Sequence, residues 1–296
     1  MDLSVWLSTG NPWTEVAERA RTVEALGFHG IWIADHFMPD DGMGPVTNPM
    51  LECLGVLAGL ATVTSRPRLG SLVLSATYRQ PAVLANTAAT IDIVSGGRLV
   101  LGVGAGWQVN EHEMYGIPLG PPRERIARFE ETCQVLRGLR DQARTTVEGE
   151  HVRVTDAVME PKPAGPLPLL IGSSGPRMAR VVARHADEWN TWGTPDGFAE
   201  KVAHVDRALE EAGREPSTLR RSTQALVFVG PDGATTAEAV RAMRPAIGGT
   251  VEQLAETLAA YRDAGVDELI VPDFTLGAGD AFGEQLAALL EAHAAA

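Results

Sequence analysis

The sequence predicts a single (β/α)₈ barrel spanning residues 1–296. Short, nearly continuous runs of Val, Ile and Leu alternate eight times with longer amphipathic segments. Runs of this kind are typical of parallel strands that are buried on both faces and joined by helices. The length of 296 residues also suits one barrel of this type. An open doubly wound sheet is the alternative, and the eightfold alternation favours the closed form.

The expected strands and helices follow one another in regular order. The strands are expected at 3–7, 30–34, 68–74, 98–103, 167–172, 187–191, 219–229 and 268–271. The helices are expected at 14–26, 50–64, 81–94, 123–139, 176–185, 195–212, 235–243, 250–264 and 278–296. Thr14 is a candidate N-cap and Gly27 a candidate C-terminal residue of the first helix. Pro81 suits the first position of the helix that it opens.

Two segments interrupt this rhythm. Residues 145–163 contain short alternating runs, and we interpret them as a hairpin inserted before the fifth strand. Residues 244–249 are expected to form an irregular insertion.

Composition limits the classes of partner. The formal net charge is −13, and the acidic residues are spread along the chain, so a nucleic-acid partner is not expected. No signal peptide is apparent and no apolar run reaches about 18 residues, so no membrane association is expected. The two cysteines, Cys53 and Cys133, are interpreted as buried thiols of a cytoplasmic protein. No histidine pair lies with a carboxylate at metal-ligand spacing, and no metal site is expected.

In such a barrel, the loops that follow the strands carry the chemistry. The second strand leads into Asp35 and His36, a carboxylate beside an imidazole that could tune proton transfer. The alternative for this pair is a helix-capping aspartate with a surface histidine. The third strand delivers further polar side chains, namely Ser75, Thr77, Tyr78 and Arg79.

The fourth and fifth strands lead into glycine-rich turns. The turn at 102–106 has the wrong spacing for a dinucleotide fingerprint, and we expect it to let the backbone approach a flat ligand. The fifth strand ends in Gly172-Ser173-Ser174-Gly175-Pro176-Arg177. Free backbone N–H groups and the dipole of the following helix would make an anion pocket there, and Arg177 could add charge. A phosphate group is the favoured ligand, and an ordinary capped turn is the alternative. The sixth strand delivers Trp189, Asn190 and Trp192, and its indoles would either pack the top of the barrel or form a pocket wall.

Motifs along most of the chain resemble the luciferase-like monooxygenase superfamily, and in particular its branch that depends on the deazaflavin coenzyme F420. They include Gly30-Ile-Trp-Ile-Ala-Asp-His-Phe37, Leu69-Gly-Ser-Leu-Val-Leu-Ser75, Tyr78-Arg-Gln-Pro81, Ser95-Gly-Gly-Arg-Leu99, Leu101-Gly-Val-Gly-Ala-Gly-Trp107 with Asn110-Glu111, Tyr115-Gly-Ile-Pro118, Pro161-Lys-Pro163, Leu170-Ile-Gly-Ser-Ser-Gly175 and Ala183-Arg-His-Ala-Asp-Glu-Trp-Asn190. The resemblance implies a (β/α)₈ barrel that is often a homodimer.

The resemblance also implies roles for individual residues. Leu72 and Val73 would form a bulge behind the cofactor ring, commonly with a cis peptide bond. Asp35 and His36 would lie beside the ring. The cofactor channel would be lined by Ser75, Ala105, Gly106 and Asn110, and the phosphate-binding turn would be formed by Ser173, Ser174, Gly175 and Pro176. The sugar-phosphate dehydrogenases of the family carry a tryptophan where Asp40 stands here and a glutamate where Trp107 stands, which argues against glucose 6-phosphate as the substrate.

The favoured function is hydride transfer between the deazaflavin and a small organic substrate. His36 would donate or accept a proton, Asp35 would orient His36 or the ring, and Trp6, Trp107 and Trp192 would form an apolar substrate wall. An FMN-dependent monooxygenase that uses oxygen is the first alternative. A non-catalytic flavin-binding protein is the second. A zinc or magnesium hydrolase is disfavoured because its ligands are missing.

Overall fold

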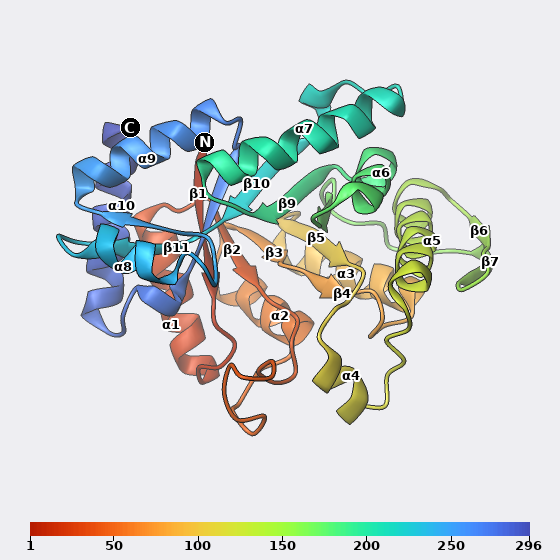
Figure 1. Ribbon diagram of the computed structural model, residues 1–296. Coiled ribbons are helices and arrows are strands. Elements are labelled where there is room, and N and C mark those ends of the chain that lie inside the picture. The colour runs from red at the N-terminus through yellow and green to blue at the C-terminus, as the bar shows by residue number, and fades with distance from the viewer.

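The computed structural model describes residues 1–296 and contains a closed barrel of parallel strands surrounded by helices (Figure 1). The barrel strands are β1 (Asp2–Leu7), β2 (Gly30–Ile33), β3 (Arg68–Ser71), β5 (Leu99–Gly104), β8 (Leu169–Gly172), β9 (Glu188–Trp192), β10 (Arg220–Gln224) and β13 (Glu268–Pro272). They pair in the order β3-β2-β1-β13-β10-β9-β8-β5, and a further pairing between β3 and β5 closes the ring. The predicted fold class is confirmed.

Helices cover the outside of the barrel. They are α1 (Trp13–Leu26), α2 (Cys53–Val63), α3 (Pro81–Ser95), α5 (Pro122–Asp141), α6 (Pro176–His185), α7 (Pro195–Glu211), α9 (Val251–Asp263) and α10 (Asp280–Ala295). The main hydrophobic core of 64 buried residues lies between these helices and the strands. A second, smaller apolar cluster of Trp32, Leu72, Val100, Leu170 and Ile270 joins four barrel strands and, through Leu72, the segment that follows β3. Both clusters hold the strands in register, so that their C-terminal ends converge on one face.

Two of the predicted strands are each divided in the structure. The strand expected at 68–74 is interrupted after Ser71, and the short β4 (Leu74–Ser75) continues it along β5. The strand expected at 219–229 becomes β10 in the barrel and β11 (Leu226–Val229) outside it. β11 pairs in parallel with β12 (Ala246–Gly249) to form a separate two-stranded sheet.

The prediction of an irregular segment at 244–249 is wrong for its last four residues, which form β12. Gly248 and Gly249 have low intrinsic strand propensity, so the sequence pattern did not indicate a strand here. The structure explains why a glycine stands here. A Cβ atom on Gly248 would lie 2.3 Å from the carbonyl oxygen of Gly233, the first residue of α8 (Gly233–Val240). Close packing of α8 on β12 therefore requires a residue without a side chain.

Smaller differences concern helix ends and an additional helix. α1 begins at Trp13, and Thr14 lies in its first turn, so Thr14 does not cap the helix. The short helix α4 (Val109–Met114) was not predicted. The segment interpreted as a hairpin contains the antiparallel strands β6 (Thr145–Glu148) and β7 (Arg153–Ala157). Two single-turn 3₁₀ helices, η1 (Pro216–Thr218) and η2 (Asp273–Thr275), complete the chain.

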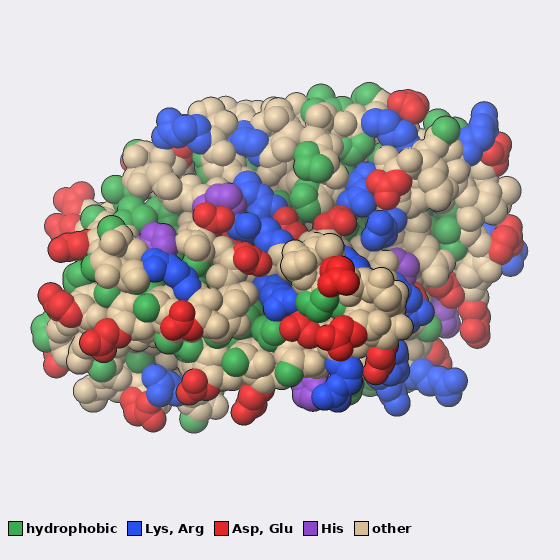
Figure 2. Space-filling model, turned by 90° about the horizontal axis from the view of Figure 1, so that it is seen from above, with side chains coloured by type: hydrophobic (Ala, Val, Ile, Leu, Met, Phe, Trp, Pro, Cys, Tyr) green, Lys and Arg blue, Asp and Glu red, His purple; other side chains and the backbone are tan.

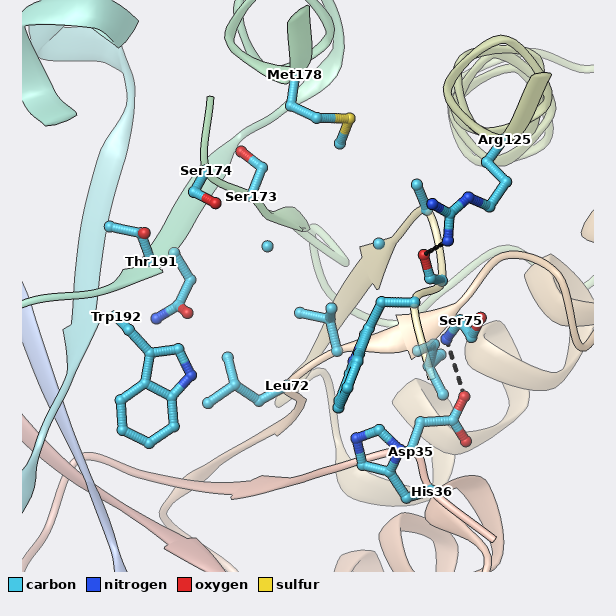
Figure 3. Close-up of a pocket in the computed structure, with 18 of the residues that line it drawn as sticks. Asp35, His36, Leu72, Ser75, Arg125, Ser173, Ser174, Met178, Thr191 and Trp192 are labelled. Carbon is cyan, nitrogen blue, oxygen red and sulfur yellow. Dashed lines mark hydrogen bonds between the residues drawn. The ribbon is translucent and has the colours of Figure 1, made fainter. Parts of the chain in front are cut away.

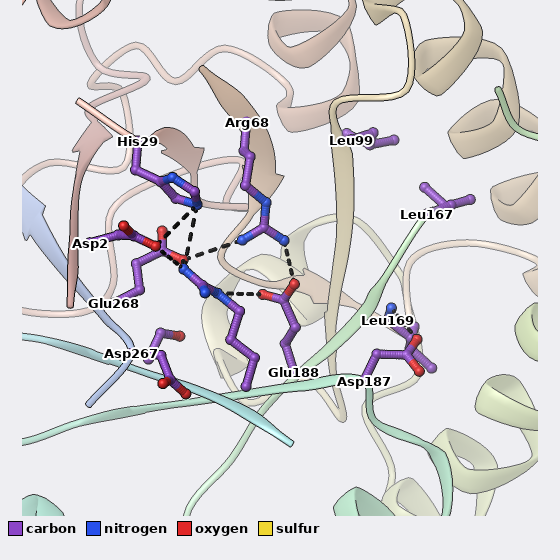
Figure 4. A network of polar contacts seen from close by, with 12 residues as sticks. Asp2, His29, Arg68, Leu99, Leu167, Leu169, Asp187, Glu188, Asp267 and Glu268 are labelled. Atoms are coloured by element: carbon purple, nitrogen blue, oxygen red, sulfur yellow. Dashed lines mark hydrogen bonds and ion pairs between the residues drawn. The ribbon is translucent and has the colours of Figure 1, made fainter. Parts of the chain in front are cut away.

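The base of the barrel, where the strands begin, holds a network of charged side chains (Figure 4). Arg68 pairs with Glu188 and Glu268, and Arg220 pairs with Glu268 and Asp2. The Glu268 carboxylate also accepts hydrogen bonds from Ser4 at 2.6 Å and from the Trp32 indole at 2.8 Å. Opposite charges and hydrogen bonds thus compensate the burial of the Glu268 carboxylate.

Acidic and basic side chains are interspersed over the face seen in Figure 2, as the spread of charge along the sequence suggests. No helix is both long enough and apolar enough to span a membrane. No cluster of three or more His, Cys, Asp or Glu side chains has a geometry that could hold a metal ion.

Candidate active site

A cavity of about 530 Å³ lies at the C-terminal ends of the barrel strands. Figure 3 shows Asp35 and His36 on one side of it and Ser173, Ser174 and Trp192 on the other, with Leu72 between them. These residues come from loops far apart in the sequence. The barrel brings the loops together because all eight strands run in the same direction.

The floor of the cavity is formed by the connection between β3 and β4. The peptide bond between Leu72 and Val73 is cis, as the resemblance implies. The Val73 side chain lies against Gly104 and Gly172, the last residues of β5 and β8. A Cβ atom on either glycine would lie 2.9 Å from a methyl carbon of Val73. The two glycines therefore leave room for the Val73 side chain. No side chain of either glycine projects above this floor, which suits a flat ligand.

His36 lines the cavity, and its partner is Glu111 of α4 rather than the neighbouring Asp35. The His36 Nδ1 atom lies 3.0 Å from Glu111 Oε1. The Phe37 backbone N–H donates to Glu111 Oε2 at 2.9 Å, and the Tyr78 hydroxyl also donates to this carboxylate. Burial alone would raise the pKa of Glu111, but the hydrogen bonds from His36, Tyr78 and Phe37 outweigh burial and lower it.

Asp35 is bound on the opposite side of the same loop. Its carboxylate accepts a hydrogen bond from the Ser75 backbone N–H at 2.9 Å and two from the Arg79 guanidinium at 2.6 and 2.7 Å. Arg79 also pairs with Glu52, which precedes α2. This bidentate pair fixes Asp35 at the edge of the cavity, and its hydrogen bonds join β2 to the β4–α3 loop. Asp35 makes no hydrogen bond to His36, so the prediction that it orients the imidazole is not supported by this geometry.

The turn between β8 and α6 presents unpaired backbone donors. The N–H groups of Ser174, Gly175, Arg177 and Met178 make no hydrogen bond within the chain. Gly175 has a φ of 100°, a conformation that favours glycine, and Pro176 begins α6. Free N–H groups at the start of a helix form an anion-binding pocket. Ser173 and Ser174 line the cavity at this point.

The wall on the β9 side is aromatic and cationic. Trp6 lies edge-on to Trp192, with ring centroids 5.9 Å apart, and edge-on to Phe274 at 5.1 Å. The Arg244 guanidinium lies 5.1 Å from the Trp192 ring centroid, which is cation–π geometry. Trp107 stands apart from this group, edge-on to His36 at 5.5 Å. The three tryptophans predicted as one wall therefore belong to two sides of the cavity.

Three cations line the cavity and lack a carboxylate partner. They are Arg125 of α5, Lys201 of α7 and Arg244 before β12. Arg125 donates to the Gly106 carbonyl at 2.9 Å, which holds it at the rim. In a chain with a net charge of −13, unpaired cations around one cavity indicate an anionic ligand. The flat floor, the free N–H groups and these cations together fit a planar cofactor that carries a phosphate.

The model of the luciferase-like monooxygenase family matches residues 1–248. The chain belongs to this family. It is 35% identical over 217 residues to an F420-dependent glucose-6-phosphate dehydrogenase of Nakamurella multipartita, covering 70% of this chain and 61% of that relative. It is 31% identical over 217 residues to an F420-dependent hydroxymycolic acid dehydrogenase of Mycobacterium tuberculosis, covering 73% and 59%. The match thus spans about three fifths of the length of these curated relatives.

The fold of this luciferase-like protein is shared with solved structures. The coenzyme F420-dependent tetrahydromethanopterin reductase of Methanopyrus kandleri superposes with a TM-score of 0.80 over 97% of this chain and 96% of that one. Its sequence identity is 18%, so the likeness concerns the fold alone.

Most residues predicted for the site of this luciferase-like protein lie on the cavity. They are Trp6, Asp35, His36, Leu72, Val73, Ser75, Ala105, Gly106, Trp107, Gly172, Ser173, Ser174 and Trp192. Gly175, Pro176 and Arg177, which come directly after Ser174, are exposed and do not line the cavity. Asn110 also lies off the cavity, because its side-chain amide donates to the Pro39 carbonyl at 2.9 Å.

Sequence reasoning assigned no role to Glu111, Arg125, Lys201 or Arg244. The sequence contained one signal for Glu111, its position beside Asn110 in a motif shared with the family. The three cations lie inside or next to segments predicted as helices or as an irregular insertion. Only the packing of α5, α7 and β12 beside the strand ends brings them to the cavity.

Proposed function

We propose that this chain is an F420-dependent oxidoreductase that transfers a hydride between the deazaflavin and a small organic substrate. The observation that carries the proposal is one cavity that joins an anion pocket at α6, a flat floor at Val73 and a histidine at its rim. The names of the Nakamurella and Mycobacterium relatives support F420 as the cofactor.

Each part of the cofactor has a matching part of the cavity. The free N–H groups of Ser174, Gly175 and Arg177 would hold the phosphate. The Leu72–Val73 floor would lie against the flat ring, and the Arg125 guanidinium would add positive charge beside the anionic cofactor. When bound, coenzyme F420 would supply the hydride acceptor or donor. The chain would position the reacting partners and exclude water.

His36 is the group placed to handle the proton. When a hydride leaves a carbon that bears a hydroxyl group, the hydroxyl proton must leave as well, and the reverse reaction returns it. In this proposal the Nε2 atom of His36 accepts or donates that proton. Asp35 would contribute by holding the loop after β2 in place through Ser75 and Arg79.

The substrate would differ from the sugar phosphate named for the Nakamurella relative. Trp107 lies edge-on to His36, at the position where the sugar-phosphate dehydrogenases of the resemblance carry a glutamate. An indole has no acceptor for sugar hydroxyl groups. Trp6 and Trp192 add apolar surface across the cavity. These residues favour a substrate that is largely apolar around the reacting carbon.

Titration of the purified protein with F420 and, separately, with FMN tests the choice of cofactor. Deazaflavin fluorescence and flavin fluorescence report the two dissociation constants. We expect F420 to bind at least about tenfold more tightly than FMN, which corresponds to about 1.4 kcal/mol. Tight binding of FMN without measurable F420 binding would identify the monooxygenase alternative and refute the proposal.

The His36→Ala variant tests the chemistry. We expect kcat to fall by about 10²- to 10⁴-fold, the usual contribution of a general acid or base, with F420 affinity within about twofold of the parent. Turnover would be followed on a panel of alcohols, ketones and unsaturated carbonyl compounds. Full turnover by the variant would eliminate His36 as the proton-transfer group. Binding of F420 without turnover on any compound would favour a non-catalytic binding protein.

A further inference from the structure

We infer that Glu111 is a positioning residue, which fixes the tautomer of His36 and directs its Nε2 atom to the reacting group. The inference deepens the proposed function and rests on it. Glu111 is fully buried, whereas the His36 side chain is partly exposed at the cavity. The carboxylate therefore acts on the substrate only through the imidazole.

The hydrogen bonds determine the charge of Glu111. Its two oxygens receive the Tyr78 hydroxyl, the Phe37 backbone N–H and the His36 ring. A phenol and a backbone amide are donors to a carboxylate, and both favour its ionised form. The lowered pKa of Glu111 has this cause, acting against a burial that would raise it. At neutral pH the group facing His36 is thus an anion.

An ionised carboxylate only accepts hydrogen bonds, so the Nδ1 atom of His36 must carry a proton. In the neutral imidazole the Nε2 atom is then the free acceptor, ready to take a proton from a substrate hydroxyl. After that transfer, the negative charge of Glu111 stabilises the imidazolium. The same division of work, with a buried carboxylate behind a histidine, operates in serine hydrolases.

The surroundings of Glu111 hold it in this position. Gln108, just before α4, donates to the Met38 carbonyl at 2.9 Å, and Asn110 donates to the Pro39 carbonyl at 2.9 Å. His112 Nε2 lies 2.7 Å from the Thr77 hydroxyl, on the loop that also carries Tyr78. Side chains in α4 and just before it thus connect the segment after His36 with the segment after β4. This explains why α4 carries buried polar residues where an amphipathic pattern would place apolar ones.

Several charged or titratable groups surround the pair and enter any pH measurement. Asp35 lies next to His36 in the chain, and Arg79 neutralises it through two hydrogen bonds. The Tyr78 hydroxyl has a pKa raised by burial and by its bond to Glu111, so it stays protonated. The His112 ring lies against Tyr78, with centroids 4.8 Å apart. Glu111 is the anion in direct contact with His36.

The Glu111→Gln variant tests the inference because it keeps the shape of the side chain and removes its charge. We expect kcat to fall by about 10- to 100-fold, as for other residues that orient a functional histidine. F420 affinity and the KM of the substrate should stay within about twofold. The acidic limb of the pH profile of kcat should move to lower pH, because the protonated imidazole loses its counterion.

Glu130→Gln is the matched control. It removes another carboxylate that faces a histidine, since Glu130 Oε1 lies 3.6 Å from His185 Nε2, but this pair is outside the cavity lining, so we expect kcat within about threefold of the parent. The double variant His36→Ala/Glu111→Gln closes a mutant cycle. If Glu111 acts through His36, its substitution causes no further loss of kcat in the His36→Ala background. An equal loss in both backgrounds would overturn the inference, as would an unchanged pH profile in Glu111→Gln.

Nitrogen NMR of the ¹⁵N-histidine-labelled protein, with and without F420, reads the tautomer directly. We expect a protonated Nδ1 and an unprotonated Nε2 in neutral His36. The opposite tautomer would overturn the inference, even if Glu111→Gln fails to fold. This measurement also separates the two proposals. If His36→Ala retains turnover, the catalytic role of His36 fails while the NMR result still decides whether Glu111 sets the tautomer.

Discussion

The two ends of the barrel are built from the same strands but differ in how their arginine side chains are paired. At the base, Arg68 and Arg220 are matched by carboxylates of the chain, namely Glu188, Glu268 and Asp2. At the mouth, Arg125 and Arg244 line the cavity without a carboxylate partner. At the base, the charged side chains pair with one another. At the mouth, the unpaired donors of Arg125 and Arg244 remain available to an anionic ligand.

The two ends also differ in their backbone. The base side chains begin regular strands, where the backbone donors and acceptors are used in the barrel ladder. The mouth contains Gly104, Gly106, Gly172 and Gly175, and the turn before α6 leaves the N–H groups of Ser174 and Gly175 unpaired. Stability is therefore expected to depend on the base, and ligand affinity on the mouth. Substitutions that move one property without the other test this division.

The largest effect is expected from Glu268→Ala at the base. The substitution removes an acceptor shared by Arg68, Arg220, Ser4 and Trp32. The buried Ser4 and Trp32 donors lose their partner, whereas Arg68 keeps Glu188 and Arg220 keeps Asp2. We expect the free energy of unfolding to fall by about 3–5 kcal/mol, the usual cost of breaking a buried ion pair. Urea denaturation measures it, and Glu268→Gln is the milder control. F420 affinity of the folded fraction should not change. A loss below about 1 kcal/mol would mean that the network contributes little to stability.

An intermediate effect is expected from Gly175→Ala at the mouth. Gly175 adopts φ 100° and ψ 156°, where a Cβ atom costs about 1–3 kcal/mol. The exposed turn can relax and disturb its N–H groups, so we expect about a tenfold loss of F420 affinity, equivalent to about 1.4 kcal/mol. Gly27→Ala is the matched control, because Gly27 has φ 84° between the end of α1 and the start of β2, at the opposite end of the barrel from the turn before α6. It should lower stability only. Unchanged affinity in Gly175→Ala would remove the turn from the proposed phosphate site.

The smallest effect is expected from Asp2→Asn, at the exposed edge of the base. Asp2 is partly buried, which raises its pKa, but the hydrogen bond from Arg220 outweighs this and lowers it. A lowered pKa means that the ionised group stabilises the fold above pH 3.8 and that this contribution is lost as the pH falls through the lower, folded-state value. Because the side chain is 42% exposed, we expect less than about 1 kcal/mol at pH 7.

Unfolding curves of both proteins between pH 7 and pH 3 check this prediction. The difference between the parent and Asp2→Asn should be constant at neutral pH and should shrink below pH 3.8. A difference that grows on acidification would contradict the assignment of an ionised Asp2 at the base.

The sequence alone determined the barrel and much of its mouth. Strand composition, glycine placement and the Pro176 helix start are local signals, and they located Asp35, His36 and the turn before α6, whereas the Leu72–Val73 floor was implied by the family resemblance. Only the tertiary structure decided the partners of these residues. Sequence neighbours suggested that Asp35 serves His36, but hydrogen bonds join His36 to Glu111, 75 residues away, and Asp35 to Arg79. The direction of a side chain depends on the packing of separate loops over the strand ends, and no local pattern encodes that packing.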